Sequence, residues 1–338
     1  MTVSSKSSPL FPAPEEKYMR RAIQLAYNGA GFVSPNPMVG AVIVAADGRI
    51  IGEGWHRKHG GPHAEVNAVA SVADADVHLL KEATIYVTLE PCSHYGKTPP
   101  CSLLLIEKGL GRVVIGSADP FPLVSGRGVK MLRNAGIEVI EDFLREECDE
   151  INRKFITAHT RKRPYILLKW AQSADGFIAA FSENGEMKPV ALSSDYTKML
   201  MHSLRAQYDA ILIGTNTAIV DNPSLTTRLW PGKSPVPVLF DSPRLPDDLQ
   251  LMSRKHILLD TSLNLDEQMH NLYKEHGITS LMVEGGAQTL DCFLKNKLYD
   301  EIRVEVSPKI LGNGVNAPQI PCNLLLSESK KIDNNLIY

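Results

Sequence analysis

The sequence lacks several features that would place the protein in a membrane, outside the cell or on nucleic acid. No apolar run approaches the roughly 18 residues that a spanning helix needs, so no membrane span is predicted. Residues 1–14 are rich in serine and proline without an apolar core, so we expect a flexible tail rather than a secretory signal. The 36 Lys and Arg residues nearly balance the 38 Asp and Glu residues, which argues against a nucleic-acid partner.

Cysteine is also scarce. The five cysteines are an odd number and are too scattered for a disulfide framework (Cys92, Cys101, Cys148, Cys292 and Cys322). This usage favours a reducing, cytoplasmic location, where two neighbouring cysteines more often indicate a metal site or a reactive pair than a disulfide.

The length of 338 residues predicts two domains. Strand and helix patterns alternate in both halves, which predicts two α/β domains. The predicted helices cover 15–28, 63–72, 102–108, 128–135, 194–207, 265–276 and 287–296. The predicted strands cover 39–45, 50–51, 84–89, 112–116, 165–170, 210–213, 236–240, 256–259, 280–283 and 301–306. A charged amphipathic segment, 141–162, precedes Arg163-Pro164 and marks the boundary. We therefore expect a tail over 1–14, a first domain over 15–150, a linker over 151–163 and a second domain over 164–338.

Chemistry-bearing residues cluster in the first domain. His63-Ala64-Glu65 opens a predicted helix, Cys92 follows a predicted strand, and Cys101 comes nine residues later. One imidazole and two thiolates are a typical set for a catalytic zinc ion, with water as the fourth ligand. Glu65 is placed to carry protons without binding the metal, and His-x-Glu followed by Pro-Cys is typical of zinc nucleobase deaminases. Each feature alone is weak, and a closed structural zinc would need a fourth ligand, for which His94 is the near candidate.

The loop between the two cysteines is longer than in most cytidine and tRNA adenosine deaminases, which have Cys-x-x-Cys. Eight residues intervene here, and they include His94 and Lys97. Such side chains beside a metal could reach a distal anionic group such as a phosphate.

The twelve-residue segment Glu90-Pro91-Cys92-Ser93-His94-Tyr95-Gly96-Lys97-Thr98-Pro99-Pro100-Cys101 resembles the RibD family of bifunctional riboflavin-biosynthesis proteins, as do His63-Ala64-Glu65 and Asn36-Pro37-Met38-Val39-Gly40. The resemblance implies a cytidine-deaminase-like three-layer α/β/α domain, followed by an α/β domain like dihydrofolate reductase. It also implies two reactions. Zinc-dependent hydrolysis removes an amino group from 2,5-diamino-6-(ribosylamino)-4(3H)-pyrimidinone 5'-phosphate, and NADPH then reduces the ribosyl group to a ribityl chain.

The resemblance assigns roles in the first domain. His63, Cys92 and Cys101 would hold Zn²⁺, and Glu65 would be the catalytic proton carrier. The pocket for the phosphorylated pyrimidine would be lined by Asn36, His56, His94 and Lys97. For His56 and Asn36, a surface histidine and an ordinary Asn-Pro turn remain the alternatives.

The second domain lacks a strand that leads into a true Gly-x-Gly-x-x-Gly helix start. Prolines follow the segment 312–317, so we expect a loop there. A stronger signal is the predicted strand that runs through Glu284 into Gly285-Gly286-Ala287 and a helix, since such a turn exposes backbone N–H groups to a phosphate. A tight strand-to-helix turn without a ligand is the alternative.

By the same resemblance, which here includes Asp221-Asn222-Pro223-Ser224-Leu225-Thr226-Thr227-Arg228, the second domain binds NADPH and the deaminated substrate. The cofactor would contact Ala171, Thr217, Asp221, Ser242, Gly285, Gly286 and Ala287. The substrate would contact Lys169, Arg205, Leu225, Arg228 and Glu284. Arg205 and Arg228 suit a bidentate phosphate clamp, although Arg205 could instead lie on the solvated face of its helix.

Three departures from the family pattern keep other interpretations open. Ala191-Leu192-Ser193-Ser194 stands where relatives have Trp-Ile-Thr-Ser, Pro237 stands where an arginine is usual, and the sequence ends at Tyr338 before an expected last strand. One alternative is a deaminase with a lapsed reductase domain, and another is a non-catalytic, zinc-stabilised binding protein in which Glu65 is dispensable. The long zinc loop and the absence of a basic surface disfavour a tRNA or cytidine deaminase. Relatives assemble as dimers or tetramers, so the resemblance also implies a homo-oligomer.

Overall fold

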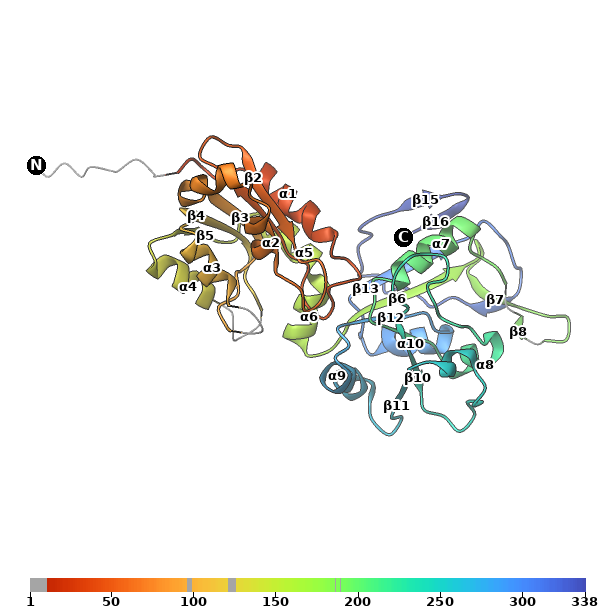
Figure 1. Cartoon of the computed structure of the whole chain (residues 1–338). Coiled ribbons are helices and arrows are strands. Elements are labelled where there is room, and N and C mark those ends of the chain that lie inside the picture. Colours follow the sequence, from red (N-terminus) through yellow and green to blue (C-terminus); the bar gives the residue numbers. More distant parts are fainter. Residues whose placement is uncertain (1–10, 96–98, 121–125, 186, 189) are drawn as a thin grey trace, which may run out of the picture. The chain divides into compact units, whose positions relative to one another are not determined.

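The computed structural model describes residues 11–95, 99–120, 126–185, 187–188 and 190–338. The chain forms two compact units, Met1–Thr160 (unit 1) and Arg161–Tyr338 (unit 2) (Figure 1). The division falls inside the predicted linker, most of which is the helix α6 (Arg153–Arg161). In the described parts of the chain, no helix has both the length and the apolar character that crossing a bilayer requires.

Unit 1 contains a five-stranded sheet in the order β2-β1-β3-β4-β5. Its strands are β1 (Gly40–Val44), β2 (Ile50–Trp55), β3 (Thr84–Leu89), β4 (Arg112–Ser117) and β5 (Glu138–Ile140). β1 runs antiparallel to β2 and β3, whereas β3, β4 and β5 are parallel. A short 3₁₀ helix, Asp74–Glu82, precedes β3.

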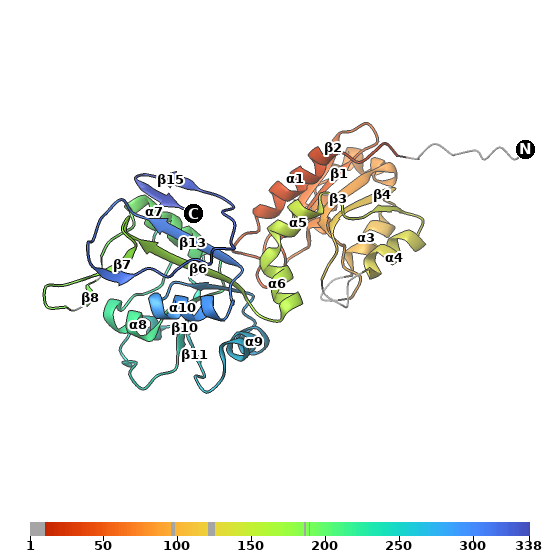
Figure 2. The ribbon, with the colours of Figure 1, turned by 180° about the vertical axis from the view of Figure 1, so that it is seen from behind.

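Helices cover both faces of this sheet, because both sets of alternating strand residues are apolar. Val42, Tyr86 and Val114 pack with α1 (Glu16–Tyr27) and α5 (Arg145–Ile151). Ile43, Ile85 and their neighbours pack with α2 (Ala64–Ala70), α3 (Cys101–Glu107) and α4 (Arg127–Asn134). Figures 1 and 2 show α1 on the opposite side of the sheet from α3 and α4. The predicted three-layer α/β/α domain is confirmed.

Glycine allows two of these helices to lie close to the sheet. A Cβ at Gly40 would lie 1.9 Å from the Ala22 carbonyl oxygen of α1, and one at Gly54 would lie 2.3 Å from the Ala68 nitrogen of α2. The contact at Gly54 therefore positions α2, whose N-cap residue is His63.

The predicted tail over 1–14 is anchored near its end. Arg112 is buried, its Nη1 donates to the Pro12 carbonyl oxygen, and its guanidinium lies 4.9 Å from the centre of the Phe11 ring. Residues 11 and 12 are therefore packed against unit 1, whereas residues 1–10 lie outside the described part of the chain.

Unit 2 contains an eight-stranded sheet in the order β11-β10-β9-β12-β6-β13-β16-β15. Its strands are β6 (Tyr165–Gln172), β9 (Ala210–Leu212), β10 (Val236–Phe240), β11 (Ile257–Leu259), β12 (Ser280–Val283), β13 (Glu301–Val306), β15 (Lys330–Ile332) and β16 (Asn335–Ile337). The six strands from β11 to β13 in this order are parallel, and β16 and β15 are antiparallel additions.

Two apolar layers enclose this sheet. Leu168, Leu212 and their neighbours pack with α9 (Leu265–His276) and α10 (Ala287–Lys295). On the other face, Leu167, Ile211 and Met282 pack with residues of α7 (Asp195–Arg205) and α8 (Thr215–Asp221). A short 3₁₀ helix, Gln250–Ser253, lies between β10 and β11.

A separate three-stranded antiparallel sheet has the order β14-β7-β8, with β7 (Phe177–Phe181), β8 (Met187–Lys188) and β14 (Gly314–Asn316). The loop predicted over 312–317 is therefore wrong in part, because residues 314–316 pair with β7. Gly314 permits this pairing, since a Cβ there would lie 1.9 Å from the Ala179 carbonyl oxygen. The sequence analysis also did not predict β16, which pairs with β13 close to Tyr338.

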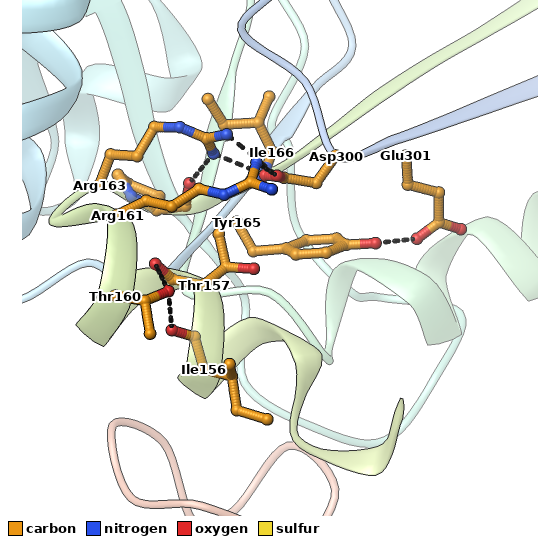
Figure 3. Close-up of polar contacts among 10 residues, drawn as sticks. Ile156, Thr157, Thr160, Arg161, Arg163, Tyr165, Ile166, Asp300 and Glu301 are labelled. Carbon is orange, nitrogen blue, oxygen red and sulfur yellow. Dashed lines mark hydrogen bonds and ion pairs between the residues drawn. The ribbon is translucent and has the colours of Figure 1, made fainter. Parts of the chain in front are cut away.

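A buried aspartate fixes the beginning of β6. Asp300 accepts hydrogen bonds from Arg163 and from the Ile166 N–H, and it also pairs with Arg161 (Figure 3). The Arg163 and Asp300 side chains are almost fully buried. Beside this cluster, the Tyr165 hydroxyl donates to Glu301.

Replacing Asp300 by alanine should destabilise unit 2 strongly, because the substitution leaves the Arg163 guanidinium buried without its counter-charge. We expect the free energy of unfolding of unit 2 to fall by about 3 kcal/mol. Thermal and denaturant unfolding measure this loss. Glu328→Ala is the control, since Glu328 pairs with Lys330 on the surface, and equal effects of the two substitutions would contradict the prediction.

Candidate active sites

Three potential metal ligands meet in unit 1 from separate elements. His63 is the N-cap residue of α2, Cys92 follows β3, and Cys101 is the first residue of α3. Their ligand atoms all lie within 4.8 Å of one another. His63 Nδ1 is 3.4 Å from Cys101 Sγ and 3.6 Å from Cys92 Sγ.

These distances fit a tetrahedral zinc ion. With Zn–N and Zn–S bonds of usual length, a nitrogen and a sulfur on one tetrahedral edge lie about 3.5 Å apart. The set of three ligands is typical of catalytic zinc sites. His94, the near candidate for a fourth protein ligand, is exposed and does not belong to the cluster found among the described residues.

The surroundings favour negative charge on Cys92, and zinc ligation requires its cysteine ligands as thiolates. The Cys101 side chain and His63 hydrogen-bond to Cys92 and lower the pKa of its thiol to about 4. The Cys101 backbone N–H also donates to Cys92 Sγ at 3.2 Å. The pKa of Cys101 is raised by its hydrogen bond to Cys92 and by burial, and the hydrogen bond to Cys92 raises the pKa of His63 to about 9.

Glu65 lies on α2, two residues after His63, and is only 3% exposed. Burial, with a contribution from the nearby Cys92, raises the pKa of its carboxyl to about 7. A carboxyl group with such a pKa can both accept and release a proton near neutral pH.

A cavity of about 60 Å³ lies beside the metal ligands. It is lined by Asn36, Pro37, Val39, His56, His63, Glu65, Leu89, Glu90, Cys92 and Asp119. His56 is 3% exposed, so it is not a surface histidine. Its Nδ1 lies 3.0 Å from the Pro62 carbonyl oxygen and its Nε2 lies 3.2 Å from Asn36 Nδ2. Burial lowers the pKa of His56, so a neutral ring that donates through Nδ1 satisfies both contacts.

Of the other two predicted pocket residues, His94 is exposed and does not line the described cavity. Lys97 lies outside the described residues.

Two cavity residues, Glu90 and Asp119, were not predicted. The Glu90 carboxylate accepts hydrogen bonds from the backbone of Gly126 and Gly128, at 3.0 and 3.1 Å, and thereby holds the start of α4. Gly128 is required there, because a Cβ would lie 2.1 Å from the Pro91 carbonyl oxygen. The sequence signal was available, since Glu90 directly precedes Pro91-Cys92 and the two glycines flank the start of a predicted helix.

Unit 2 contains a larger cavity, of about 220 Å³. It is lined by Lys169, Trp170, Ala171, Ile178, Ala179, Met187, Val190, Thr217, Asp221, Glu284, Gly285 and Gly286. Seven of the predicted cofactor and substrate residues are therefore together: Lys169, Ala171, Thr217, Asp221, Glu284, Gly285 and Gly286. Burial raises the pKa of Asp221.

The starts of α8 and α10 converge at this cavity. Gly214 and Gly286 are their N-cap residues, and the Gly286 N–H donates to Thr217 Oγ1 at 3.1 Å. A Cβ at Gly214 would lie 2.4 Å from Thr289 Oγ1, and one at Gly285 would lie 2.7 Å from Thr289 Cβ. Close packing through glycine thus brings together two helix N-termini, which suits the phosphates of a nucleotide cofactor. Ala287 is the first residue of α10.

Arg205 does not lie on a solvated helix face. It forms a two-pronged ion pair with Glu284, with Nε–Oε1 and Nη2–Oε2 distances of 3.2 and 2.6 Å, and both side chains are 13% exposed. Burial alone would raise the pKa of Glu284, but the charge of Arg205 and its hydrogen bonds lower it. The guanidinium group of Arg205 is therefore bound to the Glu284 carboxylate and is not directed at a phosphate site.

The remaining predicted residues of unit 2 lie outside the described cavity lining. Leu225 is buried, and Arg228 is exposed and donates to Ser224 Oγ at 3.2 Å. Ser242 Oγ accepts from the Arg244 backbone at 3.3 Å.

Comparisons with known proteins cover both units. Residues 164–338 match the RibD C-terminal domain, and residues 12–117 match the cytidine and deoxycytidylate deaminase zinc-binding region. The riboflavin biosynthesis protein RibD of Aquifex aeolicus is 40% identical over 328 residues, which cover 89% of each chain. The RibD of Escherichia coli is 35% identical and the match covers 88% of this chain and 89% of the relative. The crystal structure of a diaminohydroxyphosphoribosylaminopyrimidine deaminase/5-amino-6-(5-phosphoribosylamino)uracil reductase from Thermotoga maritima is 38% identical, with a TM-score of 0.82 and coverage of 95% and 97%.

Replacing Glu90 by glutamine should loosen the contact between the segment before Cys92 and the start of α4, because only the amide oxygen can accept, so that the N–H of Gly126 or of Gly128 loses its partner. We expect a loss of about 1–3 kcal/mol in the stability of unit 1 and weaker zinc retention. Thermal unfolding and zinc content after dialysis measure these changes. Glu82→Gln serves as the control at an exposed position, and unchanged zinc retention in Glu90→Gln would contradict the prediction.

Proposed function

Because this chain belongs to the RibD family, and is therefore a zinc-dependent deaminase and an NADPH-dependent reductase, we propose that unit 1 deaminates 2,5-diamino-6-(ribosylamino)-4(3H)-pyrimidinone 5'-phosphate and that unit 2 reduces the ribosyl group of the product. One observation carries the first assignment: His63 Nδ1 and the sulfurs of Cys92 and Cys101 meet beside the buried Glu65. The second rests on the cavity at the starts of α8 and α10.

The deaminase residues have separable tasks. Zinc, when bound by His63, Cys92 and Cys101, supplies a hydroxide at neutral pH. Glu65 would accept one proton from the attacking water and pass it to the ring nitrogen, and would then take the water's second proton and pass it to the amino group, which leaves as ammonia. Its pKa of about 7 suits both transfers.

The substrate-binding roles in unit 1 divide between the ring and the phosphate. Asn36 and the neutral His56, which contact each other in the cavity, would read the edge of the pyrimidine. His94 and Lys97 would bind the phosphate from the loop between the cysteines.

In the reductase unit, alignment is the main contribution of the protein, since hydride transfer needs the donor and acceptor carbons held together. NADPH, when bound, supplies the hydride. Its phosphates would dock at the Gly285-Gly286-Ala287 turn beside Thr217, and its remaining contacts would involve Ala171, Asp221 and Ser242. Lys169 and Glu284 lie at the same cavity and would contact the sugar side of the substrate, with Arg205 acting through Glu284. Leu225 and Arg228 would complete the substrate site.

The segment that departs from the family pattern is well anchored, which favours a working reductase over a lapsed one. Lys309 Nζ donates to the Ala191 carbonyl oxygen, and the Ser194 side chain caps α7 by accepting from the Thr197 N–H. Asn335 Nδ2 donates to the Leu192 carbonyl oxygen. These contacts support an ordered wall beside the cavity.

We further propose that the enzyme is cytoplasmic and forms a homodimer or homotetramer. Sedimentation analysis of the purified chain tests the assembly, and a monomer at micromolar concentration would refute it.

Glu65→Gln should slow deamination by about 10²-fold or more while zinc stays bound, because the amide keeps the size of the side chain but cannot carry protons. Ammonia release and zinc content of the same preparation are the measurements. NADPH oxidation with the deaminated product should not change. If the rate of deamination were unaffected, Glu65 would not be the proton carrier, and the zinc-stabilised binding protein would regain support.

Thr217→Val should weaken NADPH binding, because valine keeps the shape but removes the acceptor of the Gly286 N–H. We expect the Kd for NADPH to rise about fivefold, as measured by fluorescence titration. Thr261→Val, at an exposed position, is the matched control. Wild-type protein that does not bind NADPH at all would instead indicate a lapsed reductase domain.

A further inference from the structure

A second buried carboxylate lies behind the reductase cavity. Glu305 on β13 is 3% exposed and is not among the described residues that line the cavity. Its Oε2 accepts from Ser193 Oγ at 2.8 Å, and its Oε1 accepts from Asn335 Nδ2 at 2.5 Å. Burial would raise the pKa of Glu305, but hydrogen bonds and the charge of Lys169 lower it, so the group is ionised and held from two sides.

Lys169 is the cationic neighbour of this carboxylate. It lies on β6, directly beside β13, and its Nζ is 3.9 Å from Glu305 Oε2. Lys169 is 9% exposed and lines the cavity. Glu305 also accepts hydrogen bonds from the side chains of Thr197, Ser193 and Asn335. At 3.9 Å its pairing with Lys169 is electrostatic rather than a hydrogen bond.

Other charges also act on Lys169. Burial lowers the pKa of Lys169, the charges of Glu284 and then of Glu305 raise it, and those of Arg205 and Arg303 lower it. Glu284, at the end of β12, is held in an ion pair by Arg205 from α7. Among the ion pairs of the described residues, Glu305 is the carboxylate that pairs with Lys169 itself.

We propose that Glu305 is a positioning residue of the reductase site, which holds the Lys169 side chain at the cavity wall and keeps it as an ammonium ion for the substrate. This inference rests on the proposed function, because it assumes that Lys169 meets the substrate. Lys169 touches the cavity, whereas Glu305 acts through Lys169.

The residues that hold Glu305 come from two parts of the chain that sequence analysis questioned. Ser193 belongs to the segment 191–194, and Asn335 belongs to β16, near the end of the sequence. Asn335 joins them, since its Nδ2 also donates to the Leu192 carbonyl oxygen. The segment 191–194, which departs from the family pattern, therefore helps to hold Glu305 beside Lys169.

The test compares Glu305→Gln with Glu305→Asp and with Glu301→Gln, a control on the same strand. The first readout is NADPH oxidation with the deaminated pyrimidine phosphate as a function of pH. The second readout is the rate of reductive methylation of Lys169 as a function of pH, followed by peptide mass spectrometry in protein without cofactor or substrate.

In Glu305→Gln, Lys169 should lose its proton at lower pH, because an opposite charge within 4–6 Å commonly shifts a pKa by about 1 unit or more. We expect both the alkaline limb of the reductase profile and the methylation curve to move to lower pH by about that amount. The deamination rate should not change. Glu305→Asp, which keeps the charge, should stay close to wild type, and Ser193→Ala should give a smaller shift in the same direction as Glu305→Gln.

Two results would overturn the proposal: unchanged profiles in Glu305→Gln, or equal shifts in Glu305→Asp and Glu305→Gln. Ser193→Ala keeps the test decisive if Glu305→Gln does not fold, since an unchanged methylation curve in Ser193→Ala would then contradict the proposal. Wild-type protein without reductase activity would refute the proposed function instead, and the methylation curves would still decide whether Glu305 sets the charge of Lys169.

Discussion

Parallel strand pairing is the constraint on which both active sites depend. In unit 1, β3 and β4 are parallel, so the segments that carry Cys92 and Asp119 leave the sheet at the same edge. In unit 2, β9 and β12 are parallel neighbours, so the turns that begin α8 and α10 also leave together. Each such strand end leads towards a helix start, whose first backbone N–H groups have no acceptor within the helix itself. Glycines at the closest contacts allow these turns to meet.

Burial of charge gives both sites their reactivity, and it is tolerated because most of the charges are compensated. Removing an ionised group from water costs several kcal/mol unless a partner offsets it. Arg205 offsets Glu284, and Glu305 lies beside Lys169. Glu65 differs, because no cation among the described residues balances it fully, and its pKa rises to about 7. The same physical cost therefore produces a fixed ion pair in one unit, and in the other a carboxyl group that can exchange protons near neutral pH.

The sequence was sufficient to predict the features that are set by residues close to one another along the chain. The helix that begins after His63 and the strand before Cys92 are set by apolar periodicity, and the zinc ligands and Glu65 follow from their spacing around these elements. The pairing of Arg205 with Glu284 joins residues 79 positions apart, so no local pattern could reveal that the predicted phosphate clamp is engaged elsewhere. Short elements were missed for a related reason. The strands β7, β14, β15 and β16 have three to five residues, too few for a periodic pattern, and only tertiary pairing defines them.

Pro237 shows why a departure from a family pattern does not by itself indicate lost function. A proline inside a sheet is tolerated where its missing N–H has no partner to serve. The Val236 N–H and the Val238 carbonyl both form hydrogen bonds on the side of β9. Because successive residues of a strand bond to alternate sides, the backbone nitrogen of Pro237 is directed towards the β11 side. Pairing with β11 begins only at Val238, so the proline costs no hydrogen bond between strands. At the second departure, Ser193 has a defined partner in Glu305. Both positions are thus consistent with an intact sheet and an ordered cavity.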